Sequence, residues 1–232
     1  MTAWSLGPGL AAYRDGVTVI CELAARFSDA QWAAPTPCGD WRAADVAGHL
    51  RCMADDYHEY LDDAPDSRLA RLMAIGFPAA TLARKQARQN AAELAELPDV
   101  PAPEHIAAFA ASARSYAARV PPLWDRPHHY YRGTMVTVGA MAGVACGEWH
   151  VHAWDLARSL GVHYRPADPE LVFDGWWSGS PQLRPPEAAG LLVAAPVEGD
   201  VWETMLNVFG RDPGWPGHSG WPSWPGNPSW PG

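Results

Sequence analysis

The longest uninterrupted helical pattern in the sequence starts at Thr134 or Thr137 and continues to Leu160, where Gly161 follows. Glycine is favoured just past the end of a helix because it adopts the left-handed backbone conformation without steric cost. A helix of this length is stabilised mainly by burying one face against other elements. The pattern therefore predicts one long helix as the main element of a helical fold.

Three further stretches have apolar residues at helical spacing and are bounded by breaks in that pattern. These stretches are Pro8–Ala30, Ala43–Leu61 and Glu104–Val120. Residues 67–97 are rich in Ala, Leu and Arg, and Gly76-Phe77-Pro78 should divide them into two helical pieces. The segment WDRPHHYYRG at 124–133 is expected to be a loop, and strand content should be low.

Helical periodicity weakens after the long helix, where short apolar runs alternate with glycine and proline. We therefore expect a helical bundle over residues 1–165 and a small irregular C-terminal cap packed on it over residues 166–213. Residues 214–232 contain four Trp-Pro steps and few other large side chains, a composition typical of a mobile low-complexity tail. The alternative for this tail is a tryptophan-bearing segment that docks on the protein or on a partner.

Charge and composition exclude several kinds of partner. The net charge is −9, and a single lysine stands among the seventeen basic residues with no basic cluster, which argues against nucleic acid or an anionic membrane surface. We expect no signal peptide, because MTAWSLGPGLAAYRD at the start has no basic segment followed by an apolar run, and no membrane span, because no run of about eighteen apolar residues occurs. The four cysteines form no C-x-x-C pair. These features predict a cytoplasmic protein with free thiols and a small-molecule partner.

The segment GEWHVHAWDLA at 147–157 places one acid and two histidines within the predicted long helix. Positions four apart differ by about 40° around a helix, whereas positions two apart differ by about 200°. Glu148 and His152 therefore share one face, with Asp155 on the same side, and His150 points away. A carboxylate and an imidazole aimed at one point make up part of a metal site.

A complete site needs another ligand, because a catalytic zinc ion usually has three protein ligands. His49 is the best candidate, since it lies on the apolar side of the second helical stretch, which a bundle would bury. Asp45 and Asp155 are candidate hydrogen-bond partners behind the ligand histidines. The alternatives are a core histidine satisfied by a hydrogen bond, a first-turn acid at Asp45, and a salt bridge between Asp155 and Arg158.

Three motifs in the chain resemble those of one known family. TPCGDWRAADVAGHL at 36–50, GEWHVHAWDLARSLG at 147–161 and FGRDP at 209–213 are similar to motifs of the mycothiol-dependent maleylpyruvate isomerase N-terminal domain and the related DinB-like metal-binding proteins. The resemblance implies an all-α fold: a DinB-like four-helix bundle with an added helical insertion and a small irregular C-terminal cap. It also implies a divalent metal, usually Zn²⁺, held by His49, Glu148 and His152, and leaves His150 as a surface or packing residue.

The same resemblance implies a metal-dependent thiol transferase or thiol-assisted isomerase that acts on an electrophilic small molecule, with mycothiol as the expected low-molecular-weight thiol. The nucleophile would be a metal-bound thiolate or water, and no side chain would take this role. The alternatives are a non-haem iron oxygenase or a zinc hydrolase on the same residues, or a non-catalytic protein that binds or sequesters a small molecule. Cys38, Cys52 and Cys146 receive no catalytic role.

Overall fold

The computed structural model of the chain describes residues 3–62, 79–129, 135–180 and 200–215. These residues form seven α-helices and one two-stranded antiparallel sheet, which confirms the predicted all-α class. The helices are α1 (Leu6–Ala24), α2 (Ala43–Leu61), α4 (Ala79–Glu96), α5 (Ala102–Arg119), α6 (Val138–Ser159), α7 (Pro169–Ser178) and α8 (Val201–Val208). The strands are β1 (Pro127–His129) and β2 (Met135–Thr137), and the connections include the short 3₁₀-helices η1 (Asp29–Ala33) and η2 (Pro121–Leu123).

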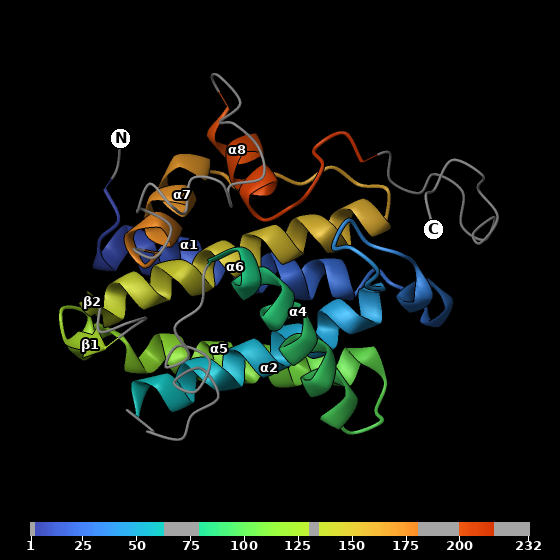
Figure 1. Cartoon of the computed structure of the whole chain (residues 1–232), viewed down its shortest axis with the longest axis horizontal. Coiled ribbons are helices and arrows are strands. Elements are labelled where there is room, and N and C mark those ends of the chain that lie inside the picture. Colours follow the sequence, from blue (N-terminus) through green and yellow to red (C-terminus); the bar gives the residue numbers. More distant parts are fainter. Residues whose placement is uncertain (1–2, 63–78, 130–134, 181–199, 216–232) are drawn as a thin grey trace.

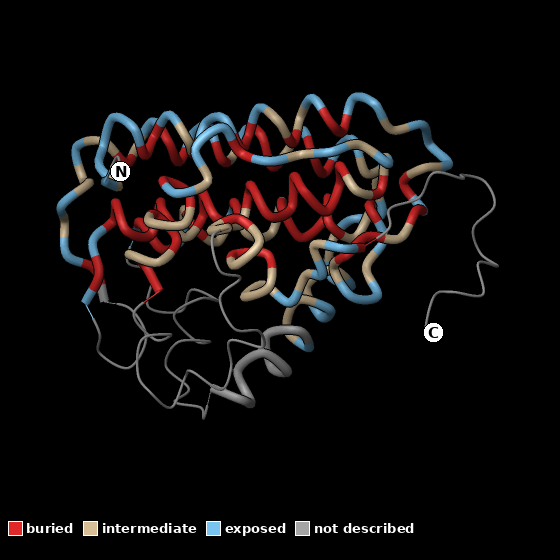
Figure 2. The backbone as a smooth tube through the Cα atoms, turned by 90° about the horizontal axis from the view of Figure 1, so that it is seen from above, coloured by how far each residue is buried: buried red, intermediate tan, exposed pale blue. Residues whose placement is uncertain are grey.

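Helices α1, α2, α5 and α6 form the predicted four-helix bundle (Figure 1). Helix α2 packs on α5, α1 packs on α6 and α5, and α2 also contacts α6. Their buried positions recur about every three to four residues, as Leu10, Tyr13, Val17 and Ile20 do on α1. In Figure 2 the buried segments of the helices lie toward the middle of the molecule. Removing these side chains from water is the main force that holds the bundle together.

Helix α6 lies at the centre of this packing. All but three of its 22 residues are buried. At its start the Thr137 hydroxyl accepts a hydrogen bond from the Ala140 N–H at 3.1 Å, and Gly161 follows its end with a φ of 69°. The structure therefore selects Thr137 of the two predicted starts and confirms Gly161 as the stop.

Glycines bring helices α6 and α7 into backbone contact. A Cβ atom at Gly143 would lie 2.1 Å from the carbonyl oxygen of Gly175 in α7, so only glycine allows this approach. Near Gly147, one turn further along α6, the side chains of Trp176 and Met205 fill the adjoining space. Helix α7 therefore packs directly on α6, α8 packs on α7, and α6 carries two of the three predicted metal ligands (Figure 1).

The first helix is shorter than predicted, because it ends at Ala24 and not at Ala30. The chain turns after Ala24 and continues into η1, where the ring of Trp32 stacks on that of Phe27 with centroids 4.4 Å apart. Phe27, which lies within the predicted first helix, thus packs against the following turn.

Strand β1 falls in the segment 124–133 that we predicted as a loop, and this prediction is wrong for Pro127–His129. These three residues lack the apolar alternation that marks a strand, so only their pairing with β2 identifies them. Of the predicted helical region 67–97, residues 67–78 lie outside the described residues, and α4 confirms the second piece.

The described part of the chain ends at Trp215, which we expected in the tail. Trp215 is only 6% exposed and belongs to the hydrophobic core. The remaining residues of the predicted tail, 216–232, lie outside the described residues. Among the described residues, no helix combines the length and apolar character needed to cross a membrane.

Candidate metal centre

The fold brings His49, Glu148 and His152 together. His49 comes from α2, the other two come from consecutive turns of α6, and one donor atom of each lies within 4.8 Å of the others. His152 Nε2 is 3.7 Å from Glu148 Oε2, and the rings of His49 and His152 meet edge to face with centroids 5.1 Å apart. These are the three residues predicted as metal ligands.

The cluster lies between α2 and α6, whose packing buries most of it. Both histidines are buried, whereas the Glu148 side chain keeps 19% of its surface exposed. Burial raises the pKa of Glu148, although His152 and Arg211 lower it in part. A cation bound beside this carboxylate would therefore favour its ionised form.

The donor set suits a divalent metal. Donor atoms around one tetrahedral zinc ion, held at about 2.0–2.2 Å, lie roughly 3.3–3.6 Å apart. All three donors already lie within 4.8 Å of one another, so small side-chain rotations would bring them to bonding distance. Two imidazoles and one carboxylate would leave a coordination position for a water or a substrate.

Asp155 lies behind His152, on the side of the ring opposite Glu148. His152 Nδ1 and Asp155 Oδ2 are 2.9 Å apart, and the Asp155 side chain is fully buried. An ionised carboxylate only accepts hydrogen bonds, so Nδ1–H donates and the lone pair of Nε2 faces the other two donors. Among the described residues Asp155 forms no ion pair with Arg158, whose guanidinium lies over the ring of Trp154.

Asp45 and His150 form hydrogen bonds outside the metal-ligand cluster. The Asp45 carboxylate accepts a hydrogen bond from the Arg42 backbone N–H at 2.8 Å, which agrees with the alternative of a first-turn acid at the start of α2. His150 is buried on the other side of α6, where its Nε2–H donates to the Ala12 carbonyl at 3.0 Å and its Nδ1 is bonded to the Tyr164 hydroxyl. His150 is thus a packing residue and not a surface residue.

Comparison with known proteins assigns the family. Residues 13–157 match the family model of the mycothiol maleylpyruvate isomerase N-terminal domain. The chain belongs to this family. It is also similar to the crystal structure of the mycothiol-dependent maleylpyruvate isomerase in a histidine-to-alanine variant, with 13% identity, a TM-score of 0.53, and coverage of 75% of this chain and 70% of that one. This likeness supports the DinB-like fold. No curated protein matches the sequence.

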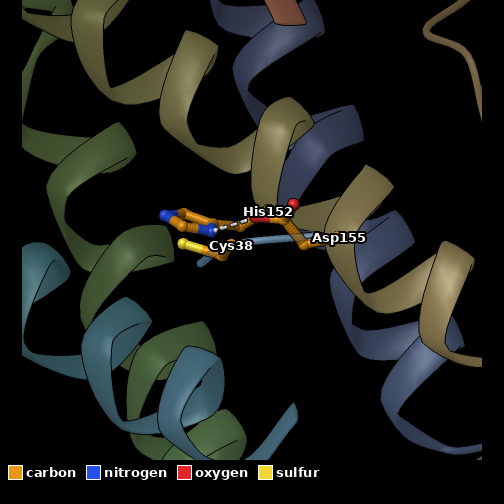
Figure 3. A group of neighbouring side chains, drawn as sticks. All are labelled: Cys38, His152 and Asp155. Atoms are coloured by element: carbon orange, nitrogen blue, oxygen red, sulfur yellow. Dashed lines mark hydrogen bonds and ion pairs between the residues drawn. The ribbon is translucent and has the colours of Figure 1, made fainter. Parts of the chain in front are cut away.

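A second cluster in this member of the mycothiol maleylpyruvate isomerase family lies on the Nδ1 side of His152. Cys38, His152 and Asp155 have donor atoms within 4.8 Å of one another, and Figure 3 shows Cys38 beside the ring. Arg211 already supplies a cation here: its Nη2 is 2.7 Å from Asp155 Oδ2 and 2.8 Å from Cys38 Sγ. Although burial raises the pKa of Asp155, Arg211 and the hydrogen bond from His152 lower it below its ordinary value.

The roles of Arg211 and Trp41 were not predicted from the sequence. The ring of Trp41 lies 4.8 Å from that of His49 and, nearly parallel, 6.4 Å from that of His152. Both residues stand in the quoted family motifs, TPCGDW and FGRDP, and this was the only available signal. Arg211 lies beyond the matched family domain, so its contact with Asp155 could not be inferred from spacing.

Proposed function

We propose that this protein is a metal-dependent enzyme that acts on an electrophilic small molecule with the help of a low-molecular-weight thiol, mycothiol. It would either transfer the thiol to that molecule or use the thiol to isomerise it. The observation that carries this function is the convergence of His49, Glu148 and His152 in a chain of the mycothiol maleylpyruvate isomerase family. These three residues would hold the metal, Zn²⁺. The protein would be located in the cytoplasm, where the thiol is kept reduced.

A divalent metal, when bound, supplies Lewis-acid chemistry that lowers the pKa of a coordinated thiol or water. The chain prepares the site for it. Asp155 fixes the protonated nitrogen of His152, so that the other nitrogen is directed at the cluster. Trp41 covers the two imidazoles with an apolar surface and limits access of water from that side.

Three of the four cysteines of the chain are poor candidates for the reacting thiol. Burial raises the pKa of the Cys38 thiol to about 12, although Arg211 lowers it in part. Burial also raises the pKa values of Cys21 and Cys146. Because the thiolate is the nucleophile, a raised pKa makes these thiols less reactive at neutral pH. An external thiol is therefore the better source of sulfur.

The function is tested by measuring thiol consumption across a panel of electrophiles, together with elemental analysis of the purified protein. We expect turnover that needs added mycothiol, stops on chelation and is lost in Glu148→Gln. Glu203→Gln is the matched control, because Glu203 lies in α8, outside the cluster, and should leave activity unchanged.

Other outcomes would identify the alternatives. Turnover that needs ferrous iron and oxygen but no thiol would indicate an oxygenase on the same residues. Turnover with metal and water alone would indicate a zinc hydrolase. Stoichiometric binding of an electrophile without turnover would indicate a sequestering protein. Each of these results would contradict the thiol-dependent function.

A further inference from the structure

Arg211 connects the C-terminal segment to helix α6 at the back of the candidate metal centre. Its Nε and Nη2 lie 3.2 Å and 2.7 Å from the two carboxylate oxygens of Asp155, so the pair is bidentate. Nη1 donates to the Phe209 carbonyl at 2.6 Å, and Nη2 also donates to Cys38 Sγ. The Arg211 side chain is only 11% exposed.

These contacts indicate an internal role for the guanidinium. Each of its three nitrogens donates to a protein acceptor, and the acceptors come from α6, from the loop before α2 and from the C-terminal segment itself. A guanidinium engaged in this way has little capacity left to bind a substrate anion. Its nearest charged neighbour, Asp155, is in turn hydrogen-bonded to His152.

The charge of Arg211 gives the buried Asp155 carboxylate a compensating partner. A buried carboxylate without a cation is costly, and its hydrogen bonds are then easily rearranged. With Arg211 in place, both oxygens of Asp155 are held, and Oδ2 points at Nδ1 of His152. Hydrogen bonds thus connect the His152 ring through Asp155 to Arg211, which lies 56 positions away from Asp155.

Building on the proposed metal centre, we infer that Arg211 is a positioning residue for it: through Asp155 it holds His152 in the ring orientation that binds the metal. The FGRDP segment, residues 209–213, would then help to form the metal site in addition to packing against the rest of the protein. Arg211 would act through Asp155 and not by touching the metal or the substrate, so it would not be a catalytic residue.

The inference is tested by the Zn²⁺ affinity of full-length Arg211→Met, measured by competition with a chromophoric chelator. We expect Zn²⁺ to bind about tenfold or more weakly, as is common when a partner behind a ligand histidine is removed. The visible absorption spectrum of the Co²⁺-loaded variant should change as well, since it reports ligand geometry. Arg211→Lys, which keeps the charge but loses the bidentate contact, should bind Zn²⁺ with intermediate affinity.

The matched control is Arg165→Met. Arg165 Nη1 pairs with Asp200 Oδ2 at 2.8 Å, so this variant also removes an arginine–aspartate contact that ties α8 to the chain, but it does so at the surface. Its Zn²⁺ affinity should stay within about twofold of wild type, because exposed ion pairs contribute little. Equal losses of affinity in Arg165→Met and Arg211→Met would overturn the inference by indicating a general effect of loosening the cap.

A double-mutant cycle with Asp155→Asn separates positioning from general destabilisation. If Arg211 acts through Asp155, the double variant should bind Zn²⁺ about as tightly as Asp155→Asn alone. Losses that multiply would overturn the inference, and so would wild-type affinity and an unchanged Co²⁺ spectrum in Arg211→Met. If the wild type binds Zn²⁺ but shows no thiol-dependent turnover, only the proposed function fails. If the wild type binds no divalent metal, both fail.

Discussion

His150 and His152 stand two positions apart on α6 and have unlike surroundings. Nδ1 of His152 is hydrogen-bonded to Asp155, and its Nε2 is directed at the cluster. In His150, Nε2 is hydrogen-bonded to the Ala12 carbonyl and Nδ1 to the Tyr164 hydroxyl. Helical geometry alone separates the two rings, because positions two apart point to nearly opposite sides. The role of each imidazole thus depends on the helix that packs against its side of α6: α2 for His152 and α1 for His150.

Replacing the two histidines should separate metal binding from stability. We expect His152→Ala to lose most of its bound metal, since a ligand is removed. His150→Ala should keep its metal but lose about 1–3 kcal/mol of stability, because buried hydrogen-bonding groups are left without partners. Elemental analysis and thermal unfolding measure both effects. Loss of metal in His150→Ala with retention in His152→Ala would contradict the assignment.

The raised pKa of Glu148 predicts how the metal-free protein responds to pH. When an acid has a higher pKa in the folded state, the folded state binds more protons, and stability falls as pH rises from the ordinary glutamate pKa of about 4.3 through the raised value. Metal-free Glu148→Gln should therefore be more stable than wild type at neutral pH. The difference in thermal midpoint should disappear below about pH 4, where both states of wild type are protonated.

At the scale of elements, the contact between α6 and α7 depends on glycine. Gly143→Ala would place a Cβ atom against the Gly175 carbonyl oxygen, so the helices must separate. We expect a loss of about 1–3 kcal/mol or more, seen as a lower thermal midpoint. Gly7→Ala is the control, because no atom lies within 4 Å of a Cβ there; it should be neutral or gain up to about 1 kcal/mol. Equal midpoints for the two variants would refute the close contact.

Elements with strong apolar periodicity were predictable from sequence. The predicted bounds of α2, Ala43–Leu61, agree with the structure, and Gly161 marked the end of α6. Periodicity works for α2 because this helix buries one face along its whole length, whereas α6 is buried almost all round and its end was marked by the glycine. It fails for β1, whose three residues take their conformation from pairing with β2, and for the end of α1, where Phe27 packs on Trp32.

At the scale of the whole molecule, the candidate site was only partly predictable. Glu148 and His152 follow from helical spacing, and His49 was added by its position on an apolar face and by family resemblance. The Arg211–Asp155 contact joins residues 56 positions apart, after α7 has packed on α6 and α8 on α7. No local pattern encodes such a pair, because it exists only after the tertiary structure has formed.

Trp215 gives a prediction about where the folded molecule ends. The indole is 6% exposed and lies in the same hydrophobic core as the bundle helices, although it follows the FGRDP segment. Removing a buried tryptophan typically costs about 3–5 kcal/mol, and in a chain of this size each kcal/mol lowers the midpoint by roughly 2–4 °C. A chain ending at Pro213 should therefore unfold several degrees below the full-length protein, whereas one ending at Trp215 should keep its midpoint and its metal.

Thermal unfolding of the two truncations side by side measures this difference. Equal midpoints would mean that the indole contributes nothing to the core, and a low midpoint for both would mean that residues after Trp215 are also needed for stability.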